Sequence, residues 1–134
     1  MEALACQEIF LMAEQEKVEL VWSFMHEDET VLCPFPERKY EILKLSKLCK
    51  IRIGPTEEIY SYAKFLYRKS GLSAKDALHL ASAIFVKADF FVTCDDRLIK
   101  RAKGTKGLDI EMELINPVDY IRQEGKEYES NENR

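Results

Sequence analysis

The sequence has little of what marks a secreted or membrane protein. Among its 134 residues the longest uninterrupted apolar run covers residues 9–13, whereas a bilayer-spanning helix needs roughly twenty. The amino terminus also lacks the pattern of a secretion signal, because Glu2 and Glu8 interrupt its apolar residues. These absences predict a cytoplasmic protein with no membrane contact.

Metal-binding histidines and cysteines are scarce as well. The chain has two histidines and four cysteines, and the cysteines are scattered with no CxxC pair. Neither histidine stands at a zinc-ligand spacing from a cysteine, which excludes a zinc site of the usual kinds. The pattern favours reduced, unpaired thiols.

An excess of positive charge is missing too. The chain carries 20 basic and 24 acidic side chains, for a formal net charge of −4 and an isoelectric point near 5.3. A generally basic surface for nucleic acid is therefore excluded, and any contact with RNA has to come from a local patch. The hydrophobic fraction of 46% is ordinary for a globular domain.

Helical and strand patterns alternate along the chain. Helices are predicted over residues 2–16, 37–49, 57–70, 74–87 and 96–103, and strands over residues 18–22, 50–53, 89–94 and 109–115. An acidic turn is predicted at residues 26–29. This alternation is typical of a parallel sheet covered by helices. We expect one domain over residues 1–121 and a polar, disordered tail over residues 122–134.

Acidic residues follow two of the predicted strands, where α/β proteins place their ligand sites. Glu27 and Glu29 follow the first strand, and Asp95 and Asp96 follow the third. Asp76, near a predicted helix start, is a further candidate. Each of them alone is explained better by helix capping or by a solvated surface than by a ligand site. Together they suggest a site for a hard divalent cation, because such an ion offsets the repulsion among gathered carboxylates.

Polar and basic residues near these acids are candidates for supporting roles in the site. Thr93 is a candidate for orienting a nearby carboxylate, or merely a residue suited to a strand. Lys100, Arg101 and Lys103 form a basic segment just beyond Asp95. They are candidates for holding an RNA backbone, the alternative being a solvated helix face.

Two segments, residues 71–83 (GLSAKDALHLASA) and 88–100 (ADFFVTCDDRLIK), resemble the carboxyl-terminal half of PIN-domain proteins, the family that contains VapC-type toxin ribonucleases. Trp22-Ser23 followed by Glu29, and the closing Asn116-Pro117, extend the likeness to about residues 2–121.

This resemblance implies a three-layer α/β/α sandwich around a central parallel sheet. It also implies cleavage of RNA by water activated on Mg²⁺ or Mn²⁺. Carried over by position, it assigns the metal-binding and catalytic carboxylates to Glu29, Asp76 and Asp95, with Asp96 and Glu27 as fallbacks. Ser23 joins Thr93 as a supporting residue. An antitoxin-like protein, RNA and a second copy of the chain are the partners that it suggests.

The sequence departs from the family pattern at its start. PIN domains open with an apolar strand that ends in an aspartate, usually followed by Thr or Ser, whereas the first aspartate here is Asp28. The loss of an interior strand predicts unpaired strand edges, marginal stability, and self-association or strand donation by a partner. A start codon assigned too far downstream explains the departure equally well.

Two functions therefore stay open. The first is a metal-dependent endoribonuclease, for which the resemblance suggests the role of the toxin in a toxin-antitoxin pair. The second is a catalytically degenerate or truncated PIN-like module that binds a partner or RNA without cleaving it. An unrelated phosphoryl-transfer domain is weaker, because the sequence has no glycine-rich phosphate loop.

Overall fold

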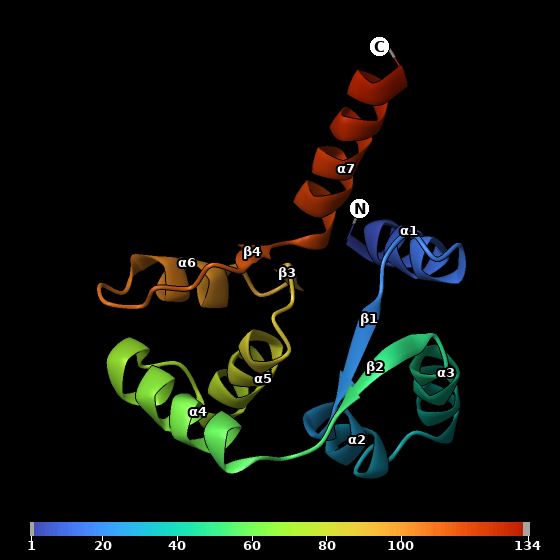
Figure 1. Cartoon of the computed structure of the whole chain (residues 1–134). Helices are drawn as coiled ribbons and strands as arrows, with labels where there is room; N and C mark the ends of the chain where they lie inside the picture. The colour runs from blue at the N-terminus through green and yellow to red at the C-terminus, as the bar shows by residue number, and fades with distance from the viewer. Residues whose placement is uncertain (1, 133–134) are drawn as a thin grey trace.

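The computed structural model describes residues 2–132, over which helices and parallel strands alternate (Figure 1). The helices are α1 (Glu2–Glu14), α2 (Phe24–Val31), α3 (Pro36–Ser46), α4 (Glu57–Ser70), α5 (Ala74–Phe85), α6 (Asp96–Gly104) and α7 (Pro117–Glu132). The strands are β1 (Leu20–Ser23), β2 (Cys49–Ile53), β3 (Phe90–Val92) and β4 (Glu113–Ile115). This order confirms the predicted α/β class. Among the described helices, none has both the length and the apolar character needed to cross a bilayer.

Local sequence signals set the bounds of the two helices that lead to the candidate site. Thr56 caps α4 by accepting a hydrogen bond from the backbone N–H of Ile59 at 3.1 Å. Gly71 ends α4 in a left-handed conformation with φ of 70°, which glycine adopts without steric cost. Ser73 then caps α5. These signals fix the short connection that turns the chain from α4 into α5.

The parallel sheet is divided into two separate pairs of strands. β1 pairs with β2, with Val21 opposite Ile51, and β3 pairs with β4, with Phe91 opposite Leu114. Within residues 2–132, no strand joins β1 to β3, and the two pairs stand apart in Figure 1. The structure therefore has parallel strands but no continuous central sheet. It also has the unpaired strand edges that the loss of an interior strand predicts.

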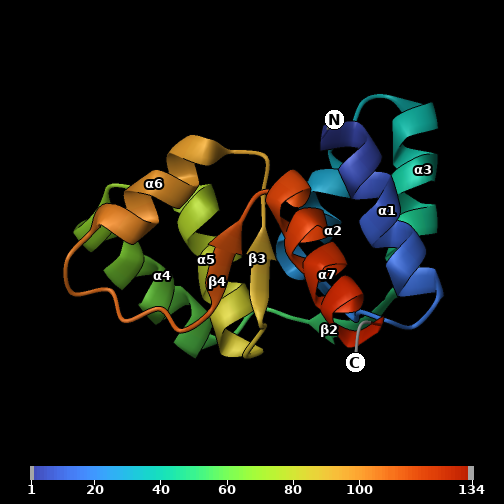
Figure 2. The ribbon, with the colours of Figure 1, turned by 90° about the horizontal axis from the view of Figure 1, so that it is seen from above.

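The main hydrophobic core lies among α4, α5, α6 and β4. Leu66 of α4 and Leu80 of α5 are completely buried, and Leu98 of α6 and Leu114 of β4 pack with them. A smaller cluster joins α1 to α7 and to the end of β4, with Ile9 and Tyr120 among its members. Figure 2 shows α1 and α7 side by side. The larger core is the scaffold on which the candidate site is built.

Two segments differ from the sequence-based prediction. The predicted acidic turn at residues 26–29 is part of helix α2, which Ser23 begins through a reciprocal pair of contacts with His26. At the other end, α7 continues to Glu132, where a disordered tail was predicted from residue 122. Glutamate, lysine and glutamine in this segment are good helix formers, and it contains no proline. Residues 133–134 of the predicted tail lie outside the described residues.

The complete burial of Leu66 gives a direct test of the main core. We expect Leu66→Ala to lower the free energy of unfolding by about 2–5 kcal/mol, because it leaves a cavity between α4 and its neighbours. Leu32, which is 80% exposed, provides the matched control, and Leu32→Ala should change stability by less than about 0.5 kcal/mol. Urea unfolding followed by circular dichroism measures both. Equal effects of the two substitutions would contradict this packing.

Candidate active site

Asp76 lies in the first turn of α5 with its carboxylate uncommitted. The Ser73 hydroxyl accepts a hydrogen bond from the Asp76 backbone N–H at 3.1 Å. A full capping box would also have the Asp76 side chain bond back to Ser73, but only the serine half is present. Among residues 2–132 the carboxylate makes no hydrogen bond or ion pair. Capping therefore does not account for this half-buried acid.

Asp95 is the N-cap of α6. Its Oδ1 atom accepts hydrogen bonds from the backbone N–H groups of Arg97 and Leu98, at 3.1 and 3.2 Å. The hydroxyl of Thr93 in turn accepts from the Asp95 N–H at 3.1 Å, and the Thr93 N–H donates to the carbonyl oxygen of Ile115. These contacts position Asp95 at the end of β3 and leave its second carboxylate oxygen open.

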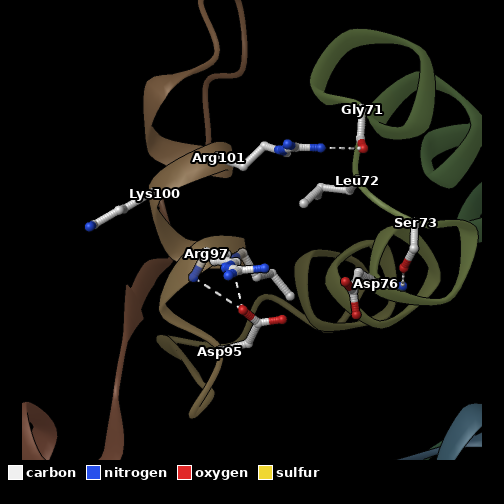
Figure 3. A pocket seen from close by; sticks show the side chains of 9 residues that line it. Gly71, Leu72, Ser73, Asp76, Asp95, Arg97, Lys100 and Arg101 are labelled. Carbon is white, nitrogen blue, oxygen red and sulfur yellow. Dashed lines mark hydrogen bonds between the residues drawn. The ribbon is translucent and has the colours of Figure 1, made fainter.

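The two aspartates line one cavity of about 520 Å³, and Figure 3 shows their carboxylates turned toward each other. Asp96, the first residue of α6, is not among the lining residues. The full lining of the cavity is Gly71, Leu72, Ser73, Asp76, Asp95, Arg97, Leu98, Lys100 and Arg101. Within residues 2–132 no ion pair joins these acids to these cations. The cavity thus has acidic and basic side chains that are not paired with one another.

The basic part of the cavity comes from one face of α6. Lys100 and Arg101, two of the three predicted RNA-binding residues, line it, whereas Lys103 does not. Arg101 also donates a hydrogen bond to the carbonyl oxygen of Gly71 at 2.9 Å, which ties α6 to the end of α4. The sequence-based reasoning missed Arg97. Its spacing of three and four residues from Lys100 and Arg101 would have placed it on the same helix face.

Glu29 belongs to α2 and contacts α5, but it does not line this cavity. Its carboxylate accepts a hydrogen bond from His79 Nε2 at 2.7 Å and lies 3.5 Å from Lys75 Nζ. Partial burial acts to raise the pKa of Glu29, but the contacts with His79 and Lys75 outweigh it and hold this pKa below its ordinary value. Because both partners lie within one helical turn of Asp76, Glu29 is a third carboxylate near the same end of α5.

Glu27 and Ser23, the other predicted residues of this region, make contacts in and next to the first turn of α2. Glu27, the fallback for Glu29, accepts a hydrogen bond from the Trp22 indole N–H at 2.7 Å. Ser23 is buried, and its backbone N–H donates to His26 Nδ1 at 3.0 Å. The centroid of the His26 ring lies 5.0 Å from that of His79, and His79 in turn bonds Glu29.

The donor set fits Mg²⁺ or Mn²⁺ in part. Among the described residues, no three Asp, Glu, His or Cys side chains converge into a complete metal site. Mg²⁺, however, is commonly held by one or two carboxylates, with waters and substrate phosphates as its remaining ligands. The facing carboxylates of Asp76 and Asp95 meet that requirement.

Comparison with known proteins identifies the family of the chain. The family model described as PIN domain matches residues 15–104, a range that includes Asp76, Asp95 and the lining of the cavity. The chain therefore belongs to the PIN-domain family, whose fold is nuclease-like and whose members generally depend on divalent metal. Comparison with curated proteins and with solved structures gave no match.

The two contacts of Asp95 can be separated by substitution. Asparagine caps helices as well as aspartate does, whereas alanine cannot, so Asp95→Ala should lower the free energy of unfolding by about 0.5–2 kcal/mol. Asp95→Asn should be close to neutral. Urea unfolding of both variants tests the N-cap. An equal loss of stability in the two variants would show that the charge of Asp95, and not its capping contact, stabilises the fold.

His26 provides a prediction about pH. Burial, and then the nearby His79, lower the pKa of His26 from its ordinary value of 6.5, against an opposing effect of Glu29. The unfolded chain therefore binds this proton more readily than the folded one. The stability that neutral His26 contributes is present above pH 6.5 and is lost as the pH falls through the folded pKa.

An NMR titration of the His26 Cε1 proton should give a midpoint below 6.5. The loss of stability between pH 7 and pH 5 should also be smaller in His26→Gln, because glutamine does not titrate. A midpoint above 6.5 would contradict the lowered pKa.

Proposed function

We propose that this chain is a metal-dependent endoribonuclease of the PIN family, with Asp76 and Asp95 as its metal-binding carboxylates. The observation that carries the proposal is their placement in one cavity with Arg97, Lys100 and Arg101. Acids that hold a cation, beside cations that hold phosphate, are what hydrolysis of a phosphodiester requires. The resemblance to VapC-type toxins supports an antitoxin-like protein as its partner in the cell.

Each element of the cavity has a place in this proposal. Asp76 and the open oxygen of Asp95 would hold Mg²⁺ or Mn²⁺, with Glu29 adding negative charge at the same end of α5. When bound, such an ion lowers the pKa of a coordinated water and offsets charge on the phosphate. Arg97 and Lys100 would contact phosphate oxygens, and neither forms an ion pair with a side chain that the structure describes. Thr93 keeps the backbone of Asp95 in position.

A second function is favoured by a different observation. The split between the β1–β2 and β3–β4 pairs leaves strand edges open within the described chain, and open edges are sites where another polypeptide can add a strand. The alternative is therefore a PIN-like module that binds a partner or RNA without cutting it. In this case the carboxylates of Asp76 and Asp95 would be retained without catalysis.

Cleavage of a mixed RNA substrate in the presence of Mn²⁺ separates the two functions. We expect the purified chain to cut RNA, and Asp76→Asn and Asp95→Asn each to reduce the rate by about 10²-fold or more, because each removes a charge from the metal site. Asp109→Asn is the matched control, since Asp109 is exposed and does not line the cavity. Each variant should unfold at the same urea concentration as the original chain.

Three outcomes are informative. Loss of cleavage in both variants but not in the control supports the nuclease. Equal cleavage by all four proteins shows a contaminating enzyme and overturns it. No cleavage by a folded chain supports the binding module, and isothermal titration with Mn²⁺ then shows whether Asp76 and Asp95 still bind metal.

A further inference from the structure

The outer face of α4 carries a second hollow, separate from the cavity of Asp76 and Asp95. It has a volume of about 480 Å³ and is lined by Ser61, Lys64, Phe65, Arg68 and Lys69. We call these five residues the α4 surface. They lie on neighbouring turns of one helix, opposite the side on which Leu66 packs into the core.

The α4 surface concentrates positive charge in an acidic protein. Lys64, Arg68 and Lys69 make no ion pair with the side chains that the structure describes, although the chain as a whole has a net charge of −4. The acidic residues of α4, Glu57 and Glu58, stand in its first turn at the far end. Three neighbouring cations without acidic partners form a local site for anions.

An aromatic ring lies among these cations. Phe65 is 39% exposed, and its ring stacks on that of Tyr62, with centroids 5.7 Å apart and an angle of 29° between the planes. Contact with Tyr62 holds the Phe65 ring in place while part of it stays open to solvent. An exposed ring beside cations matches nucleic-acid bases that stack and phosphates that bind positive charge.

The carboxyl end of α4 lies between the α4 surface and the candidate active site. The carboxyl end of α4 is bound to α6 by the hydrogen bond from Arg101 to the carbonyl oxygen of Gly71. Lys69 Nζ also lies close to Gly107, just beyond α6. A Cβ atom added to Gly107 would stand 3.8 Å from this Nζ atom. Gly71 lines the cavity, and six residues of helix, about 9 Å, separate it from Phe65.

We propose that the α4 surface binds single-stranded RNA that extends out of the Asp76–Asp95 cavity. Phe65 stacks against a base, and Lys64, Arg68 and Lys69 contact phosphates of the same strand. This inference rests on the proposed function for the identity of the strand, and it adds a binding site outside the cavity. Single-stranded RNA is favoured over a duplex because a paired base does not expose the face that Phe65 would contact.

Binding of a fluorescein-labelled oligoadenylate, followed by fluorescence anisotropy without added metal, tests the site independently of cleavage. We expect Lys64→Glu with Arg68→Glu to weaken binding about tenfold or more, and to lower the slope of log K against log salt by about 1.4 for two lost phosphate contacts. Phe65→Ala should weaken binding about fivefold or more through the lost stacking.

The matched control reverses two charges elsewhere. Lys44→Glu with Lys47→Glu makes the same change of charge in the last turn and at the C-cap of α3, where both residues are exposed, and should leave affinity within about twofold. Unlabelled duplex RNA should compete poorly with the oligoadenylate. Unchanged binding in the α4 variants, or an equal loss in the α3 control, would overturn the proposed site.

The binding assay tests the α4 surface, and the cleavage assay tests the nuclease, so the two proposals can fail separately. If the chain does not cut RNA but loses binding only in the α4 variants, the α4 surface stands and the nuclease fails. If the chain cuts RNA and the α4 variants bind and cut as the original does, the nuclease stands and the α4 surface is wrong.

Discussion

The packing of α4, α5 and α6 around one core is the constraint on which both proposed sites depend. Leu66, Leu80 and Leu98 come from these three helices and are buried against one another. Their burial sets the start of α5 beside the start of α6, so that Asp76 and Asp95 face the same cavity. The same packing turns the polar side of α4 outward. The packing of these leucines therefore determines which polar side chains the three helices expose.

The divided sheet limits how the rest of the molecule contributes. β1, β2, α2 and α3 lie to one side of α4, α5 and α6 in Figure 1, and no strand pairing joins β1–β2 to β3–β4 within residues 2–132. Glu29 is the acid that crosses from this part to α5, and it does so by binding His79 and Lys75. A strand placed between β1 and β3 would pair both open edges and join the two parts through backbone hydrogen bonds. The same added strand would therefore complete the sheet and join the part that carries Glu29 to the part that carries Asp76 and Asp95.

Local signals made much of this architecture predictable. The Thr56 cap, the Gly71 stop and the Ser73 cap define α4 and α5 from sequence alone, and Asp95 was found because it follows a strand. Helix α2 was missed because its acidic residues hide the periodicity by which helices are recognised. Arg97 could have been found from its spacing to Lys100 and Arg101. The hollow at Phe65 could not, because which side of α4 is covered depends on tertiary packing.

The candidate site also explains how two carboxylates can face each other in a fold that supplies no nearby partner for Asp76. Asp76 lies in the first turn of α5, and Asp95 caps α6. The amino ends of both helices carry partial positive charge from unpaired backbone N–H groups, which offsets repulsion between the acids. Arg97, Lys100 and Arg101 add positive charge around them without forming ion pairs. The acids therefore stand at helix ends without counter-ions, which leaves the carboxylate of Asp76 and one oxygen of Asp95 open to a cation.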